Sequence, residues 1–173
     1  MTAMMKAIPT EYNGTIFRSR LEARWAMLFD RHDILYVYEP NGYEINGCSY
    51  IPDFFLPVLN TFIEVKGDVE NRRSKEKVFN MINAVSAIDE SVNFYIADSG
   101  GRLFCPGAYF DGLTDEDYEY SVITLGHCMA NDKVFILDPP ITSICPFCKQ
   151  PFGKYIVHKI IDIDLPQFQW TGK

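Results

Sequence analysis

The stretch IPDFFLPVLNTFIEVKG, residues 51–67, is the part of the sequence on which the fold prediction depends. It reads as two apolar β-strands, yet Asp53, Glu64 and Lys66 stand inside these strands. Charged side chains are almost never fully buried unless they are paired. Three of them in neighbouring strands therefore indicate that this part of the sheet carries a site.

Strand geometry predicts that these three charges meet. Residues two apart in an extended strand face the same side, so we expect Glu64 and Lys66 to point together. If the strand with Asp53 lies beside the strand with Glu64, all three groups converge on one edge of the sheet. Two close carboxylates repel each other and favour either a shared proton or a cation between them.

This set of groups is suited to phosphodiester hydrolysis. A hard divalent cation such as Mg²⁺ prefers oxygen ligands and keeps several waters, so two carboxylates and a phosphate together suit it. The lysine beside them can orient, and help to deprotonate, a water held by the metal. We therefore expect Asp53 and Glu64 to bind Mg²⁺, or Mn²⁺ in its place, with Lys66 as their catalytic partner.

The sequence around this stretch predicts an α/β fold. Apolar residues at helical spacing predict a helix over residues 16–32, with Phe17 in its apolar stripe. Asn46-Gly47 between two apolar runs is a strong signal for a β-hairpin. The other elements expected in the first hundred residues are strands 34–40, 60–67 and 92–98 and a helix over 69–88. This order predicts a mixed β-sheet flanked by helices.

Beyond residue 100 the pattern changes. Residues 101–120 are rich in turn residues and then acidic, which predicts a loop and a short helix. Further elements are expected as strands at 121–129 and 134–138, and as a last strand or helix at 155–165. We expect a core over residues 1–100 and a C-terminal elaboration over 101–173 that completes the fold.

The predicted first helix contributes further candidates. Glu22 borders the apolar stripe near Trp25 and Phe29, so it can lean over the sheet towards the charged strands. A helix cap or a surface salt bridge is an equally good explanation for this glutamate. Arg18 and Arg20 precede it and can contact phosphate oxygens.

A second group of basic residues lies in the predicted helix over 69–88. Arg72, Arg73 and Lys75 can bind a phosphate backbone. The alternative is a solvated helix face, because Glu70 and Glu76 interrupt the basic run. The sequence leaves both interpretations open.

Cys145 and Cys148 have the spacing of half a zinc site, since a tight Cys-x-x-Cys turn directs two thiolates at one metal. A tetrahedral site needs two more ligands. The candidates are His127 and Cys128, which we favour, and Cys105 and His158. The alternative is a pair of reduced thiols in a proline-rich turn.

Pro52-Asp53, followed after ten residues by Glu64-Val65-Lys66, resembles the signature of the PD-(D/E)XK nuclease superfamily. The stretches FRSRLEARWAMLFD, YVYEP and IPDFFLP look like small phage-borne members of that group. The resemblance covers about residues 17–98. It implies a restriction-endonuclease-like core. The zinc knuckle expected in the elaboration that follows rests on the spacing of Cys145 and Cys148 instead.

The resemblance also implies roles for single residues. Asp53, Glu64 and the carbonyl of Val65 would bind Mg²⁺, Lys66 would position the nucleophilic water, and Glu22 would assist metal binding. The expected activity is that of a Mg²⁺-dependent deoxyribonuclease acting as an endonuclease or on junctions or flaps. The expected partner is DNA, and a symmetric substrate would suit a homodimer.

Composition bounds these expectations. The net charge of −7 does not favour the approach of a polyanion. It leaves open a nuclease fold used as a non-catalytic binding module, such as a phage accessory protein that docks a partner through the acidic residues 111–119. No run of about 18 apolar residues occurs, so no membrane span is expected. Five cysteines suit the cytoplasm, which would be the host cytoplasm for a phage protein.

Overall fold

The computed structural model describes residues 7–45, 48–67, 91–101, 103–104, 122–128, 130–137, 149 and 158–161. Within these ranges the fold is mixed α/β, with one α-helix, α1 (Arg20–Arg31), and a 3₁₀ turn, η1 (Pro57–Leu59). The strands are β1 (Thr10–Tyr12), β2 (Thr15–Phe17), β3 (Val37–Tyr38), β4 (Tyr43–Ile45), β5 (Cys48–Tyr50), β6 (Phe54–Leu56), β7 (Thr61–Lys66), β8 (Asn93–Asp98), β9 (Leu103–Phe104), β10 (Val122–Cys128), β11 (Lys133–Leu137) and β12 (His158–Ile161).

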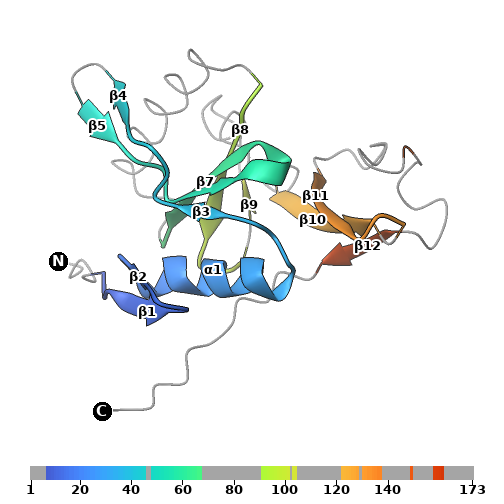
Figure 1. Cartoon of the computed structure of the whole chain (residues 1–173), viewed down its shortest axis with the longest axis horizontal. Coiled ribbons are helices and arrows are strands. Elements are labelled where there is room, and N and C mark those ends of the chain that lie inside the picture. The colour runs from blue at the N-terminus through green and yellow to red at the C-terminus, as the bar shows by residue number, and fades with distance from the viewer. Residues whose placement is uncertain are drawn as a thin grey trace, which may run out of the picture.

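The main sheet has the strand order β11-β10-β9-β8-β7-β6-β3, and β12 also pairs with β10 (Figure 1). Strands β7 and β8 are parallel, whereas the other pairs are antiparallel, so the predicted mixed sheet is confirmed. Parallel neighbours need a crossover connection, which is usually a helix. The helix predicted over residues 69–88 would be that connection, but it lies outside the described residues.

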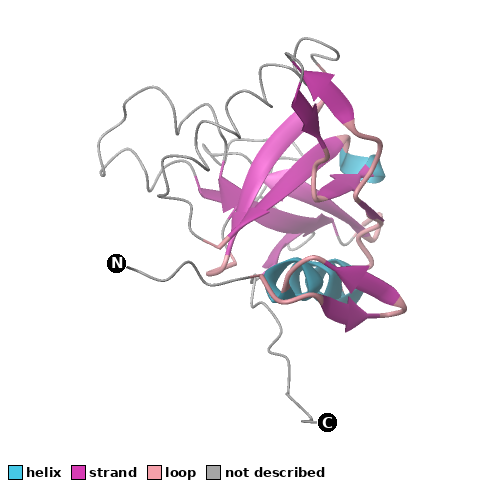
Figure 2. Cartoon of the chain, turned by 90° about the vertical axis from the view of Figure 1, so that its left-hand side faces the viewer, coloured by secondary structure: helices cyan, strands magenta, loops and turns pink. Residues whose placement is uncertain are grey.

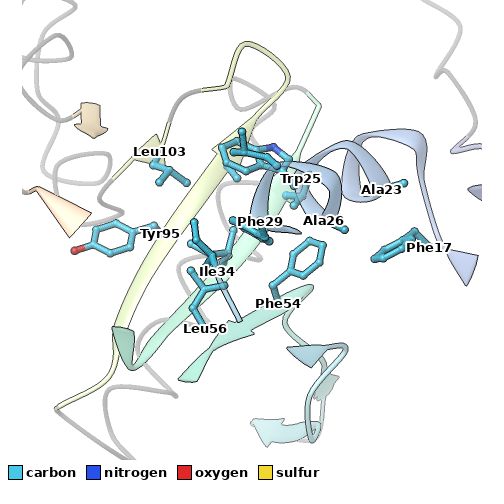
Figure 3. Packing of buried hydrophobic residues seen from close by; sticks show 14 residues of the cluster. Phe17, Ala23, Trp25, Ala26, Phe29, Ile34, Phe54, Leu56, Tyr95 and Leu103 are labelled. Carbon is cyan, nitrogen blue, oxygen red and sulfur yellow. The ribbon is translucent and has the colours of Figure 1, made fainter. Parts of the chain in front are cut away.

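Helix α1 packs on the sheet and forms the core with it. Trp25, Leu28 and Phe29 are fully buried, and Figure 3 shows Trp25 and Phe29 between the helix and the strands. The ring of Phe29 meets that of Phe54 edge to face, with centroids 5.3 Å apart. Burial of one such side chain stabilises a fold by about 1.5–3 kcal/mol. The helix is therefore held firmly against the strand that follows Asp53.

The predicted start of the first helix is wrong. Residues Thr15–Phe17 form β2, which pairs with β1, and this hairpin lies beside α1 (Figure 2). Asn13 and Gly14 make the turn with φ of 48° and 77°, the positive values that a two-residue hairpin loop requires. Phe17 is buried in the same core as the helix residues, which explains why it matched their spacing.

Other predicted strands differ in length or type from those observed. The strand expected at 34–40 is reduced to β3, which ends before Glu39, where φ is 45° in the left-handed region. Strand β9 was not predicted. Strands were correctly predicted at β8, β10 and β11, and the undecided segment 155–165 contains strand β12. The acidic residues 111–119 lie outside the described residues.

The predicted hairpin around Asn46-Gly47 is present as β4 and β5, with Tyr43 paired to Tyr50. The two turn residues themselves lie outside the described ranges. This hairpin forms a small sheet of its own, projecting at the end of the molecule away from α1 (Figure 1). It is the segment that leads the chain into Asp53.

Candidate active site

Asp53 lies beside Glu64, as the sequence predicts. Phe54 is the register partner of Ile63 in the antiparallel pair β6–β7, so Asp53 arrives next to the end of β7. There its Oδ2 accepts a hydrogen bond of 2.7 Å from the backbone N–H of Val65. The expected position at a sheet edge is wrong, because β7 is an interior strand between β6 and β8.

The two carboxylates are buried, and each of their oxygens accepts from a donor of the protein. Asp53 and Glu64 are each only 4% exposed. The Asp53 Oδ1 atom lies 2.5 Å from Nη2 of Arg18. Glu64 accepts from the Lys66 ammonium at Oε1 and from the Tyr50 hydroxyl at Oε2. The predicted pairing of Glu64 and Lys66 on one face of β7 is confirmed.

Burial and the neighbouring carboxylates control the ionisation of Asp53. Burial, and then the nearby Glu64 and Glu22 carboxylates, together raise the pKa of Asp53 to about 8. The Val65 hydrogen bond and Lys66 act in the opposite direction. Burial and then Glu64 raise the pKa of Tyr50, which keeps its hydroxyl protonated as a donor. A cation placed here would relieve the repulsion that Asp53 experiences.

Glu22 caps its own helix, which is one of the two roles that the sequence leaves open. Ser19 is the N-cap of α1 and accepts from the Glu22 N–H, while its own hydroxyl donates to Glu22 Oε1 at 2.7 Å. The Oε2 atom accepts from the Tyr38 hydroxyl at 2.6 Å and from the Arg18 N–H at 3.2 Å. Ser19 and Glu22 have the spacing of a capping box, with the N–H of Arg18 in place of that of the N-cap as the donor to Glu22. Glu22 also contributes electrostatically to the site, because it raises the pKa of Asp53.

The predicted phosphate-binding arginines take different positions. Arg18 reaches across to Asp53 and also places its Nε 2.8 Å from Glu39 Oε1, with 54% of its side chain exposed. Arg20 is the first residue of α1 and is exposed. Arg72, Arg73 and Lys75 lie outside the described residues.

Tyr38, Glu39 and Tyr50 belong to this site, and none of them was predicted. Glu39 is tied to the site by its backbone N–H, which donates to the Asp53 carbonyl at 2.9 Å. Tyr38 and Tyr50 donate to the buried Glu22 and Glu64, respectively. The sequence gives little indication of this role, because tyrosine is common in strands for packing alone. The two hydroxyls would be recognised as part of the site only if the nearby carboxylates were already known to be buried and to need donors.

The candidate zinc ligands His127 and Cys128 are consecutive residues of β10. Consecutive residues of a regular strand face opposite sides, so one ion does not reach both. His127 Nε2 lies 2.9 Å from Asp132 Oδ1, whereas Cys128 is buried and is the register partner of His158 on β12. Cys105, Cys145 and Cys148 lie outside the described residues.

A cleft of about 470 Å³ opens at the other end of α1. It is lined by the helix end, η1 and the β10–β11 turn, including His32 and His127. Burial, then Arg31 and His127, lowers the pKa of His32. The Asp53 and Glu64 carboxylates do not line this cleft, so it is separate from the charged site.

The donor chemistry at Asp53 and Glu64 fits a hard divalent cation in part. Two buried carboxylates side by side are the oxygen ligands that Mg²⁺ prefers, and burial together with the neighbouring Glu64 and Glu22 raises the pKa of Asp53. Within the described ranges, however, no three His, Cys, Asp or Glu side chains gather closely enough to hold an ion. At Asp53 the guanidinium of Arg18 supplies the positive charge instead.

Comparison with protein-family models, with curated proteins and with solved structures gives no match for this chain. Among the described residues, α1 is too short and too polar to cross a bilayer, and no other helix there could do so.

Proposed function

We propose that the protein is a Mg²⁺- or Mn²⁺-dependent nuclease that hydrolyses phosphodiester bonds in DNA. The observation that supports this most strongly is the burial of Asp53 and Glu64 side by side, with Lys66 on the same face. Leaving a buried carboxylate without compensation is costly. A fold that keeps two of them together, against their repulsion, is more readily explained by a site that uses them than by packing.

Asp53 and Glu64 would hold the ion, and the carbonyl of Val65 would assist, as the resemblance to PD-(D/E)XK nucleases implies. When bound, the cation supplies Lewis-acid chemistry that stabilises negative charge on the phosphate. Lys66, which is partly exposed beside Glu64, would hold the attacking water and stabilise its developing charge. Arg18 at the entrance would bind a phosphate oxygen of the substrate.

A second candidate, a non-catalytic binding module, is favoured by a different observation. Each oxygen of Asp53 and Glu64 already accepts from a donor of the protein. A network so fully satisfied can serve stability and specificity alone. In that case the surface around the site, rather than the carboxylates, would bind the partner.

One experiment separates these candidates. The purified protein is incubated with duplex, single-stranded and branched DNA and with RNA, in Mg²⁺, in Mn²⁺ and in EDTA. Nuclease function predicts cleavage that EDTA abolishes and that Asp53→Asn and Glu64→Gln each eliminate without loss of folding. Glu44→Gln, an exposed acidic residue of the projecting hairpin, is the charge-matched control. Absence of cleavage under every condition would support the binding module.

We also propose a structural zinc bound by Cys145 and Cys148, with Cys128 as a third ligand. The support is the position of these two cysteines in the connection between β11 and β12, which both pair with β10. The residue that follows this connection, His158, is the register partner of Cys128. A zinc there would tie the last strand to the sheet.

A further inference from the structure

Arg18 bridges the buried site and its rim. Its Nη2 lies 2.5 Å from Asp53 Oδ1, and its Nε lies 2.8 Å from Glu39 Oε1. The Arg18 side chain is 54% exposed, although it ends on an Asp53 side chain that is 6% exposed. One guanidinium therefore spans an acceptor inside the protein and another at the surface.

The oxygen that Arg18 contacts is the one an ion would need. The other oxygen, Oδ2, accepts the Val65 N–H at 2.7 Å within the sheet, and giving up that bond would orphan a buried donor. A cation at Oδ1 leaves the Val65 bond intact, so Oδ1 is the atom that we expect it to use, and Arg18 contacts that atom. A guanidinium and a divalent cation on the same oxygen would also repel each other.

The backbone of Arg18 is fixed, so that only its side chain has to move. The Arg18 N–H donates to the Tyr38 hydroxyl at 2.9 Å and to Glu22 at 3.2 Å. Glu22 in turn belongs to the capping box of α1. The side chain can leave Asp53 while Glu39 still holds it at the rim, and no secondary structure has to change.

Building on the proposed function, we propose that Arg18 is a latch that couples metal binding to substrate binding. In the protein alone it holds Asp53 and excludes the ion. A phosphate of the substrate offers the guanidinium a bidentate anionic partner, draws it away from Oδ1 and so admits the cation. Arg18 is a positioning residue in this scheme, acting through Asp53.

Coupling of this kind is reciprocal: DNA raises metal affinity by the factor by which metal raises DNA affinity. Coupling between two sites is typically about 5- to 150-fold. We expect the affinity for Mn²⁺ to rise by a factor in this range when DNA is added. A latch of this kind would keep the protein from loading a cleavage-competent ion before its substrate arrives.

The test measures Mn²⁺ binding by calorimetry in the wild type, Arg18→Gln and Asp53→Asn, all without DNA. The latch predicts that Arg18→Gln binds Mn²⁺ about 5- to 150-fold more tightly than the wild type, and that Asp53→Asn does not bind it. Arg31→Gln removes the same charge at the far end of α1 and should change the affinity little. Arg18→Lys keeps the positive charge but loses the paired N–H donors of the guanidinium. Its affinity for Mn²⁺ should therefore lie between those of the wild type and Arg18→Gln.

A second measurement separates the latch from a simple change of charge. In a Lys66→Met background, which is expected to slow cutting strongly, Mn²⁺ is titrated with and without a 20-nucleotide DNA, both duplex and single-stranded. The latch predicts that DNA strengthens Mn²⁺ binding when Arg18 is present and does so far less in Arg18→Gln. An equal effect of DNA in both proteins would overturn the latch and leave the nuclease proposal standing. If neither the wild type nor Arg18→Gln binds Mn²⁺, both proposals fail.

Discussion

The hydroxyl of Tyr50 donates to the buried carboxylate of Glu64, across 14 residues of sequence. Tyr50 belongs to the β4–β5 hairpin, which is separate from the main sheet, whereas Glu64 belongs to an interior strand of that sheet. This contact makes the projecting hairpin part of the site. It also fixes the orientation of the carboxylate that is proposed to bind the ion.

Tyr50→Phe should destabilise the metal-free protein by about 1–3 kcal/mol, because it leaves a buried acceptor without its donor. Urea unfolding in EDTA measures this. The control is Tyr50→Phe made in the Glu64→Gln protein. There the carboxylate that accepts from Tyr50 has been replaced, so the loss of stability should be smaller. Equal costs in both backgrounds would show that Tyr50 contributes by packing rather than through Glu64.

Lys66→Met should slow DNA cleavage by about 10²- to 10⁴-fold, the usual loss when a positioned acid–base group is removed. Its affinity for Mn²⁺ should not fall, because Lys66 is not proposed to be a ligand. Single-turnover cleavage and calorimetry measure the two quantities separately. Loss of Mn²⁺ binding together with activity would contradict the role assigned to Lys66.

The raised pKa of Asp53 predicts how stability depends on pH in EDTA. The pKa of this carboxyl is about 8 in the folded protein and 3.8 for an ordinary aspartate. The folded state therefore binds the extra proton between these values, and the free energy of unfolding falls as pH rises from about 4 to about 8. Urea titrations at pH 5–9 should show this fall, and Asp53→Asn should flatten it. Identical slopes in both proteins would refute the assignment to Asp53.

Ser19→Ala should cost about 1 kcal/mol of stability, because it removes the N-cap of α1. Glu22→Gln tests a separate question, since glutamine preserves the capping box but carries no charge. If Glu22 only caps the helix, Glu22→Gln should cleave DNA at the rate of the wild type. A large loss of rate, with normal urea stability, would show that its charge serves the metal site as well.

Cys128→Ser should lower the zinc content of purified protein, whereas His127→Asn should not. The two residues face opposite sides of β10, and His127 is engaged with Asp132. Elemental analysis of protein prepared without chelators gives the stoichiometry. Zinc retained in Cys128→Ser, or absent from the wild type, would rule out the proposed ligand set.

Much of the site is readable from local sequence patterns. Alternation along β7 places Glu64 and Lys66 on one face, and a short connection from β6 brings Asp53 next to them. Both follow from strand periodicity and hairpin pairing, which depend on neighbouring residues. The same reasoning wrongly placed Phe17 in the first helix, because a buried residue of a strand can match the helical spacing by chance. Phe17 belongs to the hairpin that turns at Asn13-Gly14.

The sequence by itself therefore determined that Asp53, Glu64 and Lys66 lie together where the chain enters β6 and leaves β7. Only the tertiary structure decided what neutralises them. Arg18 is 35 residues from Asp53, and no local period links them. Their contact arises because Phe29 and its neighbours pack α1 against β6. This packing brings Arg18, which precedes the N-cap of α1, to the buried carboxylate of Asp53. A non-directional hydrophobic contact sets that distance, which is why pattern alone does not reveal it.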